Sequence, residues 1–153
     1  MLVFAILDKN FRKGDLTVYK NFKKLANREV EGLDYRIRVE SRDPRVLIMA
    51  PHGGKIEPTT AEVAEAIAGH NYSFYCLEGL KEGGNNLLHI ESHLFDEPRA
   101  LQAVEKADIV ITVHGQIDQK DEFVMVGGLH KNLISEIEEQ LEAAGFETRP
   151  PTE

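Results

Sequence analysis

A chain of 153 residues can bury a hydrophobic core unaided, and we expect a single domain over residues 1–153. The net charge of −8 argues against nucleic acid as a partner, because phosphate contacts need clustered lysine and arginine. No apolar run approaches the roughly 20 residues of a membrane-spanning helix, and the single cysteine excludes an internal disulfide. With no export signal and no coiled-coil pattern, we expect a monomer that stays in the cytoplasm unless lysis releases it.

The hydrophobic pattern predicts strands that alternate with helices. In chain order we expect a strand at 2–7, a helix at 17–27, strands at 35–40 and 45–50, a helix at 60–68, strands at 72–77 and 87–91, a helix at 97–106, strands at 108–113 and 123–126, and a helix at 129–144. Thr59 and Glu62 predict a capping box at the start of helix 60–68. This alternation predicts an α/β fold with a mixed or parallel central sheet flanked by helices.

Two apolar runs end in a histidine followed by glycine. VLIMA leads through Pro51 into His52, Gly53 and Gly54, and IVITV leads into His114 and Gly115. Both runs are typical of strands buried on both faces of a parallel sheet, where ligands bind at the carboxyl ends. We therefore expect the two histidines to lie at one edge of the sheet.

Glu57 follows His52 by five residues, and its place just before a predicted helix lets it fold back towards that histidine. Two imidazoles and one carboxylate are a typical set of catalytic zinc ligands, although nickel or cobalt would also suit them. The alternative is that His52 and His114 are hydrogen-bonded turn residues and that Glu57 is an acid favoured by a helix N-terminus.

Three further histidines lie between the two apolar runs, and for the first, His70, we expect a surface or capping role after a predicted helix stop. His93, in ESHLFDEP, falls between a predicted strand and a predicted helix, and it is a candidate to reach the same cleft. His89, in NLLHIE, falls in the predicted strand 87–91. A place in the hydrophobic core is therefore as good an interpretation of His89 as a role at the site.

Several stretches resemble, in order, the phage-type poly-γ-glutamate hydrolase family. They are EVEGLDYRIRV, APHGGKIEPTTAEVAEAIAG, FYCLEGL, NNLLHIESHLFDEPRAL, ADIVITVHG and VMVGGLHKNLISEIEEQLEAAGF, and together they span about residues 19–146. Some members of that family carry only the label of phage-related replication proteins. The resemblance implies a zinc carboxypeptidase-like fold and cleavage of γ-glutamyl amide bonds in the capsule polymer of bacilli.

Carried over residue by residue, the resemblance implies zinc as cofactor and His52, Glu57 and His114 as its ligands. It also implies that His93 and the turn from Asp96 to Arg99 line the substrate cleft. Arg99 is the best candidate to bind a substrate carboxylate, because a guanidinium can hold one with two hydrogen bonds. The alternative is a solvated residue at a helix N-terminus.

Two features set the chain apart, the first from zinc carboxypeptidases and the second from the family itself. Its ligand spacing is His-x4-Glu, whereas zinc carboxypeptidases use His-x2-Glu. It also ends at ETRPPTE, without the C-terminal segment in which the family carries a glutamate resembling the carboxypeptidase general base. The catalytic base is therefore unknown, and Glu97, Asp118 and Glu122 are candidates to replace it.

These observations favour a zinc-dependent amidohydrolase that acts on poly-γ-glutamate or a γ-glutamyl peptide. A polyanionic substrate would need a local basic groove on this acidic protein, for which the candidates are Arg45, Lys55, Lys81 and Arg99. Two alternatives remain. One is a metal-dependent hydrolase of small acyl-amino acids or peptides, and the other is a catalytically weak polyglutamate-binding module that lacks the base.

Overall fold

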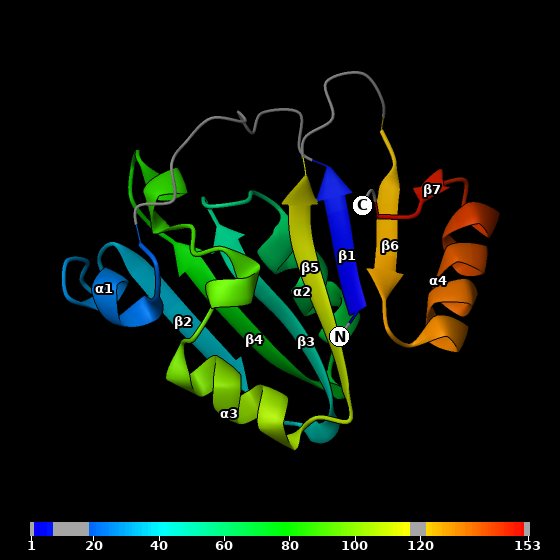
Figure 1. Cartoon of the computed structure of the whole chain (residues 1–153), viewed down its shortest axis with the longest axis horizontal. Helices are drawn as coiled ribbons and strands as arrows, with labels where there is room; N and C mark the ends of the chain where they lie inside the picture. The colour runs from blue at the N-terminus through cyan, green and yellow to red at the C-terminus, as the bar shows by residue number, and fades with distance from the viewer. Residues whose placement is uncertain (1, 8–18, 117–121, 152–153) are drawn as a thin grey trace.

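The computed structural model describes residues 2–7, 19–116 and 122–151, and its main feature is a seven-stranded mixed sheet (Figure 1). The strand order is β2-β4-β3-β5-β1-β6-β7. The strands are β1 (Leu2–Leu7), β2 (Tyr35–Glu40), β3 (Asp43–Gly54), β4 (Tyr72–Gly79), β5 (Ile109–Gln116), β6 (Val124–Gly128) and β7 (Thr148–Arg149). Strands β4, β3, β5 and β1 are parallel, whereas β2 and β6 run antiparallel to their inner neighbours.

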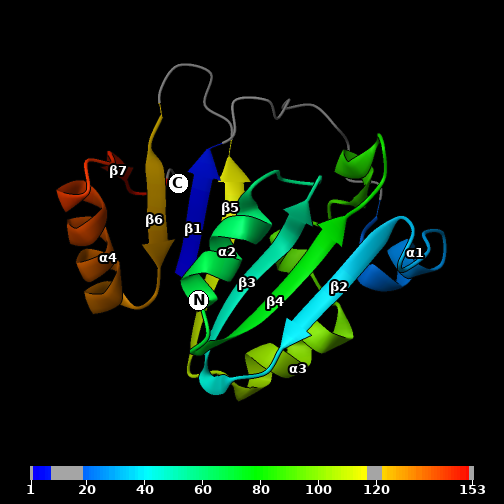
Figure 2. The same ribbon diagram turned by 180° about the vertical axis from the view of Figure 1, so that it is seen from behind.

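Helices cover both faces of the sheet, as the α/β prediction requires. The helices are α1 (Phe22–Ala26), α2 (Thr60–Ala68), α3 (Pro98–Lys106) and α4 (Lys131–Ala143), with two 3-10 turns, η1 (Asn85–Leu88) and η2 (Ser92–Leu94). Helices α1 and α3 lie on one face and α2 on the other (Figures 1 and 2). Within the described ranges, none of these helices has the length and apolar character needed to cross a bilayer.

The strands β3 and β4 separate two parts of the core by simple alternation. Leu47, Met49, Tyr75 and Leu77 pack on the face of α1 and α3, and Ile48, Ala50, Phe74 and Cys76 pack on the face of α2. Successive strand residues point to opposite faces of the sheet, so a strand without polar residues contributes side chains to the core on both faces. The prediction that 46–50 is buried on both faces is largely confirmed, since only Val46 is partly exposed.

Three predicted elements differ from the structure. The strand predicted at 87–91 is wrong, because the chain there forms η1 and then an irregular segment. Gly84 has a φ of 76°, and the Asn85 side chain accepts a hydrogen bond from Lys81 N and donates one to Lys81 O. These bonds close a compact turn in place of an extended strand.

The starts of two helices also differ. The predicted capping box is wrong, because Thr59 has a φ of 72° and its side chain makes no capping hydrogen bond. Thr60 instead donates from its hydroxyl to the carbonyl of Glu57. The helix predicted at 17–27 is shorter in its described part, where Asn21 caps α1 by accepting from Lys24 N, and residues 17–18 lie outside the described ranges. The single domain over residues 1–153 stays a prediction.

Gly53 occupies a place where β3, β4 and α2 leave no room for a side chain. A Cβ at this position would lie 2.2 Å from Cys76 Sγ, 3.1 Å from Ala61 Cβ and 3.3 Å from the Leu77 carbonyl oxygen. The glycine after His52 is therefore needed for close packing of the strand against its neighbours.

We predict that Gly53→Ala lowers the free energy of unfolding by about 1–3 kcal/mol, because the added methyl overpacks a full core. Urea unfolding measures the change. Gly83→Ala is the matched control, because a Cβ there meets no atom within 4 Å. Equal unfolding free energies for the two variants would contradict the packing described here.

Candidate metal centre

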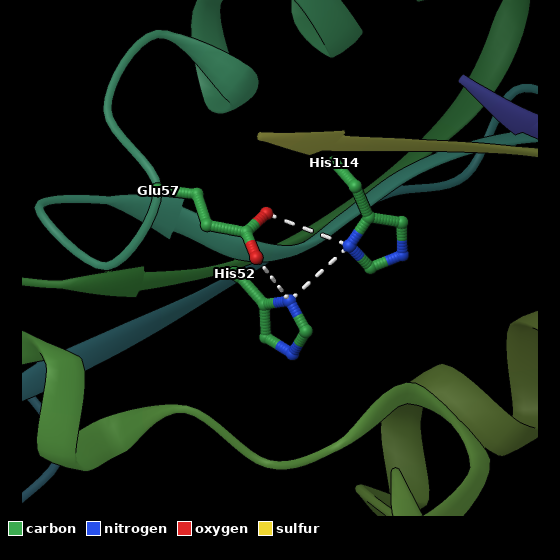
Figure 3. A group of neighbouring side chains, drawn as sticks. All are labelled: His52, Glu57 and His114. Atoms are coloured by element: carbon green, nitrogen blue, oxygen red, sulfur yellow. Dashed lines mark hydrogen bonds and ion pairs between the residues drawn. The ribbon is translucent and has the colours of Figure 1, made fainter. Parts of the chain in front are cut away.

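Three side chains from separate segments meet at the carboxyl ends of β3 and β5 (Figure 3). His52 comes from β3, His114 from β5, and Glu57 from the turn between β3 and α2. His52 Nδ1 lies 3.0 Å from Glu57 Oε1 and 3.2 Å from His114 Nδ1, and His114 Nδ1 lies 3.5 Å from Glu57 Oε2. Parallel neighbouring strands thus bring together residues 62 positions apart in the sequence.

An irregularity in β3 gives His52 its direction. Ile48 and Ala50 face α2, so strict alternation would place His52 on that same face. The pairing of β3 with β4 instead shifts register between Ala50 and Gly53. Such bulges redirect side chains beside functional sites. The His52 ring accordingly reaches the irregular segment after η1, where its Nε2 lies 2.7 Å from the Ile90 carbonyl oxygen.

The contact with Ile90 fixes which nitrogen of His52 carries the proton. A carbonyl oxygen can only accept, so Nε2 donates to it and Nδ1 keeps a free lone pair in the neutral ring. Burial lowers the pKa of His52, and although the nearby Glu57 carboxylate opposes this effect, the ring is neutral near pH 7. The lone pair of Nδ1 therefore faces Glu57 and His114.

Backbone groups of both strands hold Glu57 in place. Its Oε2 accepts a hydrogen bond of 2.8 Å from Gly115 N, and its own backbone N–H donates to the His52 carbonyl at 2.8 Å. Burial acts to raise the pKa of Glu57, but the neighbouring imidazoles, His114 most of all, lower it by more, so the pKa is well below its usual range. The carboxylate is therefore ionised although the side chain is buried.

The donor atoms fit a divalent metal such as zinc. An ionised carboxylate and the lone pair of His52 Nδ1 face each other at 3.0 Å, an arrangement that a shared cation stabilises. His114 Nε2 lies 3.4 Å from Ser92 Oγ, and when Nδ1 is a ligand the Nε2–H group can donate a hydrogen bond to this hydroxyl oxygen. Two nitrogens and one oxygen leave a fourth zinc position for water or substrate. His114 is the accessible member, with 13% of its side chain exposed.

His89, rather than His93, lies beside this cluster. The His89 ring stacks on His52 with centroids 3.9 Å apart, and its Nε2 lies 3.4 Å from Glu57 Oε1. His93 is exposed, and its Nδ1 lies 3.4 Å from Glu91 Oε2. Because 87–91 was predicted as a strand, the sequence did not place His89 beside the cluster. The preceding Gly-Gly-Asn-Asn stretch is the signal that would have predicted a turn instead of that strand. A place for His93 in the substrate cleft stays a prediction.

Arg99 is engaged by acidic side chains. Its guanidinium donates two hydrogen bonds to Glu31, at 2.9 and 3.0 Å, and one to Glu97 at 2.9 Å. A substrate carboxylate at Arg99 would therefore have to replace Glu31, and this role stays a prediction.

The three candidates for a general base differ in burial and in hydrogen bonding. Glu97 is buried and caps α3 by accepting from Ala100 N, while its other oxygen accepts from Arg99. Both of its oxygens therefore serve to hold the start of α3. Glu122 is exposed, and Asp118 lies outside the described residues. The identity of the base stays unassigned.

The expected basic groove is not formed by the four residues proposed for it. Arg45 pairs with Asp43 near the start of β3, whereas Lys55 follows the end of that strand, roughly 30 Å away along an extended chain. Lys81 pairs with Glu29, and Arg99 pairs with Glu31. Lys55 and Lys81 do lie together, since Lys55 Nζ donates to the Lys81 carbonyl at 3.1 Å. The groove hypothesis is wrong for the full set of four, because Arg45 lies at the other end of β3 from Lys55 and three of the four are paired with carboxylates.

Comparisons with known proteins identify relatives of this chain. A family model described as "Poly-gamma-glutamate hydrolase" matches residues 19–153. UPF0714 protein YndL of Bacillus subtilis (strain 168) is 42% identical over 129 residues, which are 84% of this chain and 50% of YndL. The chain spans about half the length of the curated relatives it matches.

Two solved structures share the fold. One, described as bacteriophage poly-gamma-glutamate hydrolase, has a TM-score of 0.86 and 32% sequence identity. The other, described as "YNDL-apo (Zinc-free)", has a TM-score of 0.83 and 39% identity. Each similarity covers 90% of this chain and 67% of the solved chain. The family-model match over residues 19–153 includes the strands and turns that carry His52, Glu57 and His114.

Proposed function

Since the chain belongs to the poly-γ-glutamate hydrolase family, we propose that it is a zinc-dependent amidohydrolase that cleaves γ-glutamyl amide bonds of poly-γ-glutamate. The observation that carries the proposal is the convergence of His52 Nδ1, His114 Nδ1 and the Glu57 carboxylate at one sheet edge. A related structure described as zinc-free supports zinc as the metal. A monomeric state and a cytoplasmic location are further parts of this proposal.

The residues of the chain prepare the site for this reaction. The Ile90 carbonyl holds the His52 ring with Nδ1 unprotonated, and Gly115 N–H holds the Glu57 carboxylate in place. When bound, zinc supplies a Lewis acid for the amide carbonyl and makes water a nucleophile near neutral pH. The partly exposed His114 lies where substrate can approach. Fixing all three side chains before substrate arrives avoids reorganisation during the reaction.

Metal content tests the ligand set. We expect about one zinc per chain in the wild-type protein after zinc addition and dialysis, as three protein ligands suffice for a catalytic site. His52→Ala and Glu57→Ala should each retain less than about a tenth of that amount, because metal binding requires the complete set. Elemental analysis of untagged protein makes the measurement. His70→Ala is the control, because His70 is exposed after α2. Equal zinc in His52→Ala and His70→Ala would exclude this site.

Polymer digestion tests the substrate. We expect the zinc-loaded protein to shorten poly-γ-glutamate, as measured by size-exclusion chromatography, and His52→Ala to abolish the shortening while His70→Ala retains it. Poly-α-glutamate is the matched control polymer, because it carries the same charge on a different amide bond. Cleavage of both polymers at similar rates would contradict specificity for γ-glutamyl bonds, and cleavage of neither would contradict the proposed reaction.

The paired cations favour a second candidate, hydrolysis of small acyl-amino acids or short γ-glutamyl peptides. Arg45, Lys81 and Arg99 all have carboxylate partners, so they do not offer a continuous track for a polyanion. A panel of N-acyl glutamates separates the two reactions by a higher kcat/KM for the small compounds. A binding module would instead release heat with polyglutamate in calorimetry without any turnover.

A further inference from the structure

A pocket of about 170 Å³ borders the candidate metal centre. It lies between β3, β5 and α3, and His114 contributes to both the pocket and the ligand cluster. Met49 and Pro51 line it from β3, Thr112 from β5, and Leu101 and Val104 from α3. A substrate group in this pocket would therefore lie next to the reacting bond.

The lining of the pocket is apolar. Apart from the hydroxyls of Ser92 and Thr112 and the ring of His114, the described side chains that line it are hydrophobic, and none of them is a lysine or arginine. A carboxylate placed there would lose hydration without gaining a cationic side chain from the described lining, which is costly. Its volume is close to that of an engineered cavity of about 150 Å³ that binds benzene. The pocket thus fits an uncharged group of about the size of one aromatic ring.

One polar atom in the wall has no partner. Thr112 is 5% exposed, and its Oγ1 makes no hydrogen bond to any described residue. A buried hydroxyl without a partner is unfavourable, and most such groups in folded proteins are paired. A ligand with one polar atom at this point would supply the missing hydrogen bond.

We infer that this pocket is a substrate subsite for an uncharged, methylene-rich or aromatic group that carries a single polar atom. The inference rests on the proposed hydrolase function and specifies the substrate class of that same site. The two side-chain methylenes of a γ-glutamyl unit belong to this class, whereas its α-carboxylate does not. The pocket therefore favours uncharged groups beside the cleaved amide over a second carboxylate.

Binding of small probes tests the subsite without requiring turnover. Benzyl alcohol and benzenesulfonate share one ring, but only the second carries a permanent negative charge. In methyl NMR of the zinc-loaded chain, benzyl alcohol should shift the methyl signals of Met49 and Leu101. These shifts should reach a plateau as the concentration of benzyl alcohol rises. Measured on the zinc-free chain, where no metal can bind the sulfonate, its Kd should be at least about tenfold lower than that of benzenesulfonate, because the apolar lining offers the anion no partner.

Two matched variants test the effect of a positive charge. One places the charge at the pocket and the other places it away from the pocket. Val104→Lys puts an ammonium on α3 at a residue that is 38% exposed, and Ile67→Lys does the same on α2, across the sheet, at 37% exposure. Val104→Lys should bring the two Kd values to within about threefold, whereas Ile67→Lys should keep the wild-type ratio. Thr112→Val should weaken benzyl alcohol roughly two- to tenfold and leave toluene unchanged, because only the alcohol can bond the hydroxyl.

Three results would overturn the subsite. They are no saturable shift with benzyl alcohol, equal or tighter binding of benzenesulfonate to the wild-type chain, and identical behaviour of the two lysine variants. If the chain hydrolyses γ-glutamyl bonds, benzyl alcohol should also inhibit that reaction at its NMR Kd. If it hydrolyses none, the proposed function fails while the NMR measurement still decides the subsite.

Discussion

The hydrogen bond between His52 Nε2 and the Ile90 carbonyl is the contact on which the candidate site depends. It leaves Nδ1 unprotonated and turns that nitrogen towards Glu57 and His114. Two local irregularities make the contact possible. The register shift in β3 turns His52 away from α2, and the turn at η1 keeps Ile90 out of the sheet, so its carbonyl is free to accept. Regular strands at both places would have kept the ring and the carbonyl apart.

The sheet holds the other histidine in a similarly fixed position. Strand β5 pairs with β3 along its first half and with β1 along residues 111–116, and Ala5 is the backbone partner of His114. The family match begins at residue 19, so β1 supports the ligand strand from outside the matched segment. Pairing on its β1 side places His114 in the interior of the sheet rather than at an edge. A central strand gives a ligand less freedom than an edge strand or a loop would.

Much of the site could be predicted from short sequence patterns. Two buried runs that end in His-Gly located His52 and His114, because parallel strands end at one edge, and the nearby Glu57 completed the set. The alternation of elements likewise predicted the mixed sheet and its flanking helices. Each of these inferences needs only residues close in sequence and the geometry of parallel strands.

Contacts between distant residues could not be predicted in this way. Arg99 pairs with Glu31, 68 residues away, and His52 bonds Ile90, 38 residues away. Local patterns carry no information about such partners. The place of His89 was left open for a related reason, because an apolar run of four or five residues fits a strand and a tight turn equally well.

A crystal structure of the zinc-loaded protein, with anomalous diffraction at the zinc edge, tests the central claim most directly. We expect one strong zinc peak bounded by His52 Nδ1, His114 Nδ1 and the Glu57 carboxylate, with His52 Nε2 still bonded to the Ile90 carbonyl. Zinc on His52 Nε2, or a peak away from these three residues, would contradict it.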